Sequence, residues 1–198
     1  MEILAPGIVV FNDVIPDQID LINRINYLAE TKVFEWQESM VGGENGGRKI
    51  DKSSRNCRVI SIHHGFPEDF IPMSEKEISS MFISNLFRDF FSPLLNQYFN
   101  RYKVTDITSH ENYQILRYGV DEKFGIHTDD HWKYPRRVSL TWYANDDFEG
   151  GEIEFPEFGL KIKPKKNQLL IFCSSFPYIH EVHPVTSGER YAVVQWMF

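Results

Sequence analysis

The stretch "RRVSLTWYANDDFEGGEIEFPEFGLKIKPKKNQLLIFCS", residues 136–174, decides the fold class of this 198-residue chain. Short runs rich in β-branched and aromatic residues alternate here with clusters of Gly, Pro, Asn and Asp. Such runs are typical of β-strands, and such clusters are typical of turns. The same texture extends outward to "YQILRYG" on one side and to "HEVHPV" and "RYAVVQWMF" on the other. Regular short strands with turn signals predict antiparallel sheets that form a sandwich or barrel.

The first half of the chain contains two predicted helices. One is expected at about residues 16–30, because Pro16 suits the first helical position. An apolar face at helical spacing supports it, formed by Leu21, Ile22, Ile25 and Leu28. This face should pack on the predicted sheets.

The second helix is expected to begin after Ser74, because "SEKE" has the pattern of a capping box. Its aromatic stripe of Phe82, Leu86 and Phe90 is assigned to the core, and Pro93 should kink or restart the helix. The predicted fold is therefore mainly β with flanking helices: a double-stranded β-helix core of the jelly-roll or cupin type, buttressed by N-terminal helices. Without a repeat or linker, one domain is expected over residues 1–198, with helical and strand support in 1–103 and the β core in 104–198.

Composition and charge narrow the classes of protein. The formal net charge is −7 and the pI is about 5.5, which argues against a general nucleic-acid or anionic-membrane binder. No window approaches the ~18 apolar residues of a membrane span, and "MEILAPGIVVF" lacks the basic leader of a signal peptide. Cys57 and Cys173 match no metal or redox spacing, so buried thiols are expected. These features predict a soluble, cytoplasmic protein of unknown oligomeric state.

A glycine-rich stretch, "VGGENGGRKIDKSSRN" at residues 41–56, contains almost no apolar residue. Two interpretations stay open. The stretch is either a disordered connection or a lid that covers a site.

The stretch "FGIHTDDH", residues 124–131, crowds four candidate metal ligands into five positions. In a strand, residues two apart point to the same face, so His127 and Asp129 can share an ion while Asp130 faces away. His131 would begin ~13.6 Å from His127 at the usual strand rise. The stretch therefore supplies two ligands, and a third must come from elsewhere.

A third ligand is available in "YIHEVHPV", where His180 and His183 are both candidates. Two His and one Asp on one side of an ion form the facial triad of non-haem Fe(II) oxygenases, which leaves coordination positions open. Zinc would be expected with a fourth protein ligand or in a hydrolytic three-ligand site. The residues thus favour iron.

At this point the chain resembles the Fe(II)/2-oxoglutarate-dependent dioxygenase superfamily, and within it the prolyl 4-hydroxylase-like branch. The resemblance covers roughly residues 112–196. Its ordered elements are Arg117-Tyr118, His127-x-Asp129, "GGEIEF" at 150–155, "PKKN" at 164–167, His180 with "PV" at 184–185, and Gly188-x-Arg190. The spacing His-x-x-x-Pro-Val selects His180 and leaves His183, His131 and His110 without a metal role.

The resemblance implies that a catalytic centre of His127, Asp129 and His180 holds Fe(II), with 2-oxoglutarate and O2 as co-substrates. Ascorbate is a further candidate cofactor. Arg190 would bind the far carboxylate of 2-oxoglutarate. Tyr118 and a hydroxyl from the next strand would assist it, either Ser139 or Thr141. The implied reaction hydroxylates an unactivated C–H, first of all in a prolyl residue of a peptide or protein, and converts 2-oxoglutarate to succinate and CO2.

Three positions depart from the family pattern. Asp121 stands where the family has glycine, Phe124 where it has tyrosine, and Arg190 where animal and plant prolyl hydroxylases usually carry lysine. These changes leave the predicted metal ligands intact but weaken any transfer of the substrate.

The substrate is accordingly left open. Its expected contacts are Arg55, Arg58, Trp142 and Trp196, and Trp132 and Tyr143 are further candidates for the pocket wall. One alternative is the same chemistry on a free amino acid or other small metabolite, an alkylated base being disfavoured by the acidic charge. Another is a non-catalytic β-sandwich module that binds a metal or ligand. The expected partner is a peptide, protein or small-molecule substrate, with no nucleic acid or membrane.

Overall fold

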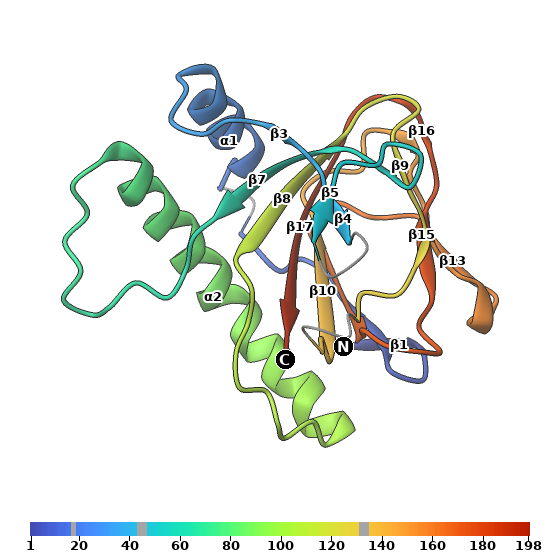
Figure 1. Ribbon diagram of the computed structural model, residues 1–198. Helices are drawn as coiled ribbons and strands as arrows, with labels where there is room; N and C mark the ends of the chain where they lie inside the picture. The colour runs from blue at the N-terminus through green and yellow to red at the C-terminus, as the bar shows by residue number, and fades with distance from the viewer. Residues whose placement is uncertain (17–18, 43–46, 131–134) are drawn as a thin grey trace.

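Two antiparallel sheets form most of this computed structural model, which describes residues 1–16, 19–42, 47–130 and 135–198 (Figure 1). The larger sheet has eight strands in the order β1-β2-β14-β10-β17-β8-β7-β3. The smaller has five, in the order β13-β12-β15-β9-β6. The prediction of a mainly β fold with antiparallel sheets is confirmed.

The bounds of the elements are as follows. The larger sheet contains β1 (Glu2–Ala5), β2 (Ile8–Phe11), β3 (Gln37–Glu38), β7 (Arg58–Ile62), β8 (Tyr113–Tyr118), β10 (Val138–Tyr143), β14 (Gln168–Cys173) and β17 (Arg190–Met197). The smaller contains β6 (Arg55–Asn56), β9 (Lys123–His127), β12 (Ile153–Phe155), β13 (Leu160–Ile162) and β15 (His180–Val182). Two short ribbons pair β4 (Val41–Gly42) with β5 (Arg48–Lys49), and β11 (Glu149–Gly150) with β16 (Val185–Ser187). The helices are α1 (Leu21–Glu30) and α2 (Glu75–Tyr102), and a 3-10 turn spans Pro156–Phe158.

The two sheets pack face to face through a shared apolar core. Tyr143 and Phe172 of the larger sheet meet Ile153 and Phe155 of the smaller one. The opposite face of the larger sheet carries both helices, whose Leu28 and Phe87 share a second core with it. Because both faces are covered, β10 and β17 are buried along their whole lengths, and the polar side chains that they contain, such as Thr141 and Arg190, are buried as well. The predicted supporting role of the helices concerns stability and stays a prediction.

Helix α1 begins at Leu21, so the predicted start at residue 16 is wrong. Asp20 is the N-cap, and its carboxylate accepts the backbone N–H of Asn23 at 3.2 Å. This bond satisfies a free N–H of the first turn, whereas Pro16 offers only a suitable backbone angle and lies outside the helix. Residues 17 and 18 lie outside the described residues.

Helix α2 begins with the predicted capping box, in which Ser74 and Glu77 each bond the other's backbone N–H. It runs through Pro93 to Tyr102 without restarting. Of the predicted core stripe, Leu86 and Phe90 are partly buried against the core, whereas the assignment of Phe82 is wrong, since this side chain is 54% exposed. The most buried large side chains of this part of the helix are Ile83, Phe87 and Phe91. Aromatic residues occur on both adjacent faces of this helix, so helical spacing alone could not choose between them.

The glycine-rich stretch contains more order than a single loop. β4 and β5 pair within it, and β6 joins the edge of the smaller sheet beside β9. Residues 43–46 lie outside the described residues, and the lid interpretation stays a prediction.

Cys57 is buried and Cys173 half-buried, both as free thiols. In the part of the chain that the structure describes, neither helix has the length and hydropathy needed to cross a membrane.

Candidate metal centre

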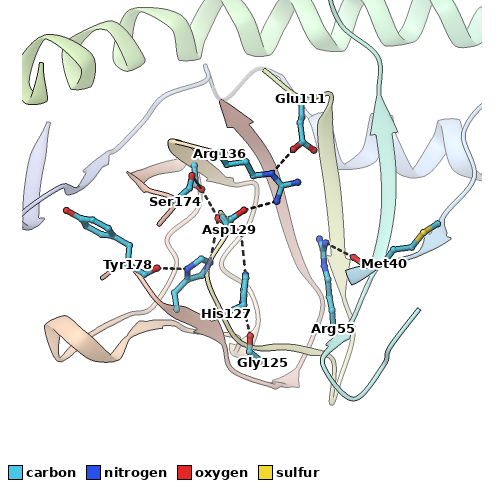
Figure 2. A network of polar contacts seen from close by, with 11 residues as sticks. Met40, Arg55, Glu111, Gly125, His127, Asp129, Arg136, Ser174 and Tyr178 are labelled. Atoms are coloured by element: carbon cyan, nitrogen blue, oxygen red, sulfur yellow. Dashed lines mark hydrogen bonds and ion pairs between the residues drawn. The ribbon is translucent and has the colours of Figure 1, made fainter. Parts of the chain in front are cut away.

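The three predicted metal ligands lie together. His127 ends β9 and His180 begins β15, and the two residues are partners across this antiparallel pair. Asp129 follows β9, with its Oδ1 3.5 Å from His127 Nε2 and its Oδ2 3.7 Å from His180 Nε2 (Figure 2). One donor atom from each residue lies within 4.8 Å of the others. This spacing suits a single ion with bonds to nitrogen and oxygen of about 2 Å.

Backbone carbonyls orient both imidazoles in the same way. His127 Nδ1 donates to the carbonyl of Gly125 at 2.8 Å, and His180 Nδ1 donates to that of Tyr178 at 3.1 Å. A neutral imidazole that uses its Nδ1 proton in this way presents an unprotonated Nε2 to a metal. Burial, reinforced by the nearby His127, lowers the pKa of His180 to about 4. The His180 imidazole is therefore a neutral nitrogen donor at pH 7.

The carboxylate of Asp129 is buried and held by Ser139. The Ser139 hydroxyl donates to Asp129 Oδ2 at 2.7 Å and lies 2.8 Å from the hydroxyl of Ser174. Burial opposes ionisation of Asp129, but His180, His127 and the Ser139 hydrogen bond outweigh it and hold the pKa well below its usual range. Ser139 was one of two hydroxyls, with Thr141, predicted to assist 2-oxoglutarate, and in the structure its hydroxyl donates to the carboxylate of the candidate ligand Asp129.

A narrow cavity borders the three residues, and Arg190 lies in its wall. This side chain is 2% exposed, with its guanidinium carbon 4.9 Å from the centre of the Tyr118 ring and 5.1 Å from that of Tyr143. Within the described residues, Arg190 Nε and Tyr143 Oη are buried without a hydrogen-bond partner. None of the ion pairs found there includes Arg190.

These residues fit the groups that the sequence predicts. A buried charge without a partner is costly, so Arg190 calls for an anion, and a carboxylate matches the planar guanidinium. The His-His-Asp donor set is the one used by Fe(II) oxygenases. The cavity thus contains a candidate metal site at His127, Asp129 and His180 and a candidate carboxylate site at Arg190.

Strand alternation explains which residues of β10 reach the cavity. Thr141 lines it, and Tyr143 contacts Arg190 from the same face. Trp142 points to the helix side, where its indole N–H donates to Asn167 Oδ1 at 3.1 Å. The structure therefore does not bring Trp142 to the site. Tyr143 was predicted only as a candidate for the pocket wall, and its contact with Arg190 makes it a candidate for the carboxylate site as well.

A larger cleft of about 400 Å³ shares His127 and Asp129 with the cavity. Two predicted substrate contacts, Arg55 and Trp196, also line both spaces. Arg58 does not line either, because its neighbour Val59 faces the cleft and alternate residues of β7 face opposite sides. Arg58 and Trp142 therefore lie outside both the cavity and the cleft, and their prediction as substrate contacts is wrong.

The remaining candidates lie elsewhere. His183 contacts Glu154 at 2.7 Å, and His110 contacts Gln195 at 3.0 Å. His131 and Trp132 lie outside the described residues. The most spacious cavity described, about 720 Å³ between α1 and the end of β10, contains none of the three candidate ligands.

Arg136 is a further residue of the site that sequence reasoning missed. Its Nη1 donates to the backbone carbonyl of Asp129 at 3.1 Å, and its Nε donates to Glu111 at 2.6 Å (Figure 2). Its guanidinium carbon also lies 4.0 Å from the centre of the Trp196 ring. Glu111 and Arg136 belong to different segments of the chain, so no local sequence pattern predicts that they form an ion pair.

Residues 113–198 match the model of a family described as the 2OG-Fe(II) oxygenase superfamily. Probable prolyl 4-hydroxylase 9 of Arabidopsis thaliana is 32% identical over 116 residues, which cover 44% of this chain and 40% of that protein. The chain thus matches about two-fifths of the length of this relative.

Two solved structures share the fold. A prolyl-4-hydroxylase from Pseudomonas putida has a TM-score of 0.68 at 18% identity, and the match covers 96% of this chain and 92% of that one. A prolyl hydroxylase from Trichoplax adhaerens, solved with a peptide fragment of the hypoxia inducible factor oxygen degradation domain, has a TM-score of 0.68 at 19% identity. That match covers 97% of this chain and 83% of the other.

Proposed function

We propose that this chain is an Fe(II)- and 2-oxoglutarate-dependent oxygenase, because residues 113–198 match the model of the 2OG-Fe(II) oxygenase superfamily. Its reaction hydroxylates an unactivated C–H, and the first candidate substrate is a prolyl residue in a peptide or protein. One observation carries the proposal: the buried cluster of His127, Asp129 and His180 lies beside a buried guanidinium, Arg190, that has no ion-pair partner among the described residues.

Each residue would have a distinct task. His127, Asp129 and His180 hold Fe(II), and Arg190 and Tyr143 hold the far carboxylate of 2-oxoglutarate, with Tyr118 against the guanidinium. When bound, Fe(II) and 2-oxoglutarate would supply the oxidation, in which the substrate, O2 and 2-oxoglutarate are converted to hydroxylated substrate, succinate and CO2. Thr141 and the apolar side chains of the cavity wall keep bulk water away from the co-substrate. The cleft beside His127 and Asp129 would place the substrate C–H.

A peptide substrate is supported by the relatives. The Arabidopsis protein is named as a probable prolyl 4-hydroxylase, and the Trichoplax structure contains a peptide. A cleft of about 400 Å³ offers room for such a segment.

We also propose that residues 1–198 form one domain, since the helices share a core with strands of both halves. The cytoplasmic location and a role of ascorbate stay predictions from the sequence.

The proposal is tested by cofactor binding and turnover. Anaerobic addition of Fe(II) and 2-oxoglutarate should give the weak visible absorption band of chelated Fe(II), and O2 should then yield succinate. His180→Ala should abolish both signals, because one of three ligands is lost. His183→Ala is the matched control and should keep them, since His183 contacts Glu154 outside the cluster. Loss with His183→Ala but not with His180→Ala would overturn the ligand assignment, and absence of the band in the wild type would overturn the function.

A second experiment identifies the product of the reaction. Prolyl peptides incubated with the loaded protein should gain one oxygen atom, measured by mass spectrometry as an increase of about 16 Da over the unreacted peptide. Succinate formation with no oxygenated product from any prolyl peptide would keep the oxygenase chemistry and reject the peptidyl substrate.

A further inference from the structure

A second buried guanidinium, that of Arg55, lies at the boundary between the cavity and the cleft. Arg55 is 7% exposed and lines both spaces. Its only described side-chain hydrogen bond is a long one of 3.4 Å, from Nη1 to the carbonyl of Met40, and its Nε is buried with no partner among the described residues. No ion pair in the described ranges includes it. Its charge therefore faces the site without a dedicated acceptor.

The backbone fixes Arg55 beside the metal cluster. Arg55 on β6 is paired with Phe124 on β9, and its guanidinium carbon lies 4.8 Å from the centre of the Phe124 ring. The same ring stacks on the His127 imidazole at 3.6 Å between centres. Figure 2 shows the Arg55 side chain extending from β6 toward the carbonyl of Met40, beside the cluster. A group bound to Arg55 would thus lie close to the ligand His127.

The charges of the loaded site call for one more anion. Arg55 and Asp129 line the same cavity and the same cleft. A divalent ion, Arg190 and Arg55 would bring four positive charges, and Asp129 with the two carboxylates of 2-oxoglutarate would bring three negative ones, so one positive charge would stay unbalanced. A single carboxylate on the substrate would neutralise the site, and a guanidinium binds a carboxylate through paired, charge-assisted hydrogen bonds.

We propose that Arg55 binds a carboxylate of the primary substrate, so that the substrate is an acid whose carboxylate lies near the hydroxylated carbon. The carboxylate comes from a free amino acid or from an acidic residue beside the target residue in a peptide. This inference rests on the proposed function and refines its substrate class. The neighbouring acid Glu38 does not compete for Arg55, because its carboxylate contacts Lys52 at 3.1 Å and Arg58 at 3.8 Å.

The test compares acids with their amides on the wild-type protein. The anaerobic Fe(II)·2-oxoglutarate form is titrated with three pairs: L-proline and L-prolinamide, N-acetyl-L-proline and its amide, and the doubly capped tripeptides Gly-Pro-Glu and Gly-Pro-Gln. Binding is measured by calorimetry and by the change in the visible band. In at least one pair the acid should bind about 10–100-fold more tightly, as for a charged hydrogen-bonded pair. The pair that responds identifies the source of the carboxylate, and equal binding in all three pairs overturns the proposal.

Variants then assign the preference to Arg55. Arg55→Gln should abolish the difference between acid and amide, Arg55→Lys should keep part of it, and the control Arg58→Gln should keep all of it. If Arg55→Gln weakens 2-oxoglutarate binding and leaves the acid preference intact, Arg55 belongs to the co-substrate and the proposal is overturned. Circular dichroism checks that each variant is folded. The comparison of acids with amides on the wild-type protein does not depend on whether a variant folds. A wild type without the visible band overturns the proposed function itself, whereas a band without acid preference overturns only this inference.

Discussion

The hydroxyl of Ser139 sets the orientation of the central carboxylate. It donates to one oxygen of Asp129, which leaves the other oxygen facing His127. Outer hydrogen bonds of this kind orient metal ligands, and their loss typically weakens metal binding by about 10–100-fold. We expect this loss in Ser139→Ala, measured by titration of the metal-free protein with Co(II) under a competing chelator. Ser187→Ala, at an exposed position of β16, is the control, and equal affinities of the two variants would contradict the role.

The Arg190 guanidinium has a separable role. Arg190→Gln removes the charge but keeps a polar side chain, so the Kd of 2-oxoglutarate should rise by about 10–100-fold, as when a charged hydrogen bond is lost. Metal binding, measured without 2-oxoglutarate, should stay near the wild-type value because Arg190 contacts Tyr118 and Tyr143 and not the ligands. An unchanged Kd for 2-oxoglutarate would remove Arg190 from the co-substrate site.

At the scale of single elements, α2 is attached to the larger sheet by aromatic rings. Phe87 is fully buried, with its ring 5.3 Å from Phe91 and 5.1 Å from Tyr113 between centres. Phe87→Ala should lower the free energy of unfolding by about 3–5 kcal/mol, through lost burial and the cavity left behind. Phe82→Ala, on the exposed face of the same helix, should change it by less than about 0.5 kcal/mol. Denaturant titration measures both, and similar losses would mean that the helix is anchored differently.

Elements were predictable to different degrees from the sequence. The strands were recognisable because their composition and turn signals are local. The start of α1 was not, because Pro16 is itself compatible with a first helical position, and the cap hydrogen bond between Asp20 and the backbone N–H of Asn23 is seen only in the structure. The buried face of α2 was predicted only in part, since Leu86 and Phe90 pack against the core but Phe82 does not, because two adjacent faces of this helix both carry aromatic residues.

For the whole molecule, acidification should reduce stability through two stacked histidines. His64 and His110 lie 4.1 Å apart between ring centres, and His64 Nε2 donates to the carbonyl of His110 at 3.1 Å. Burial lowers the pKa of both imidazoles, and the charge of His110 lowers that of His64 further. Below their ordinary pKa of 6.5 the unfolded chain binds more protons, so their contribution to stability is complete above pH 6.5 and is lost as the pH falls.

The measurement is the free energy of unfolding of the metal-free protein between about pH 7.5 and pH 5. It should fall with pH, and it should fall less in His64→Gln, which removes one of the two titrating groups. His180 titrates in the same direction but is common to both proteins, so the difference between them reports on His64. Parallel curves for the two proteins would contradict this account.

The site also shows what a whole fold adds to a sequence. The grouping of His127 with His180 followed from a family resemblance, because 52 intervening positions separate them and only the β9–β15 pairing brings them together. The contact of Arg136 with Glu111 and Asp129 has no sequence signal, since it depends on how three separate segments meet.

The two halves of the chain divide the site between them. The family match covers residues 113–198, which hold the candidate ligands and Arg190, whereas Gln37, Met40 and Arg55 of the cleft wall come from the earlier half. In β17, Ala192 and Val194 face the cavity while Tyr191 and Val193 face the helices, so this strand has little freedom to vary. Substitutions in the earlier segments should therefore change which molecules the cleft accepts, while the candidate ligands and Arg190 keep their places.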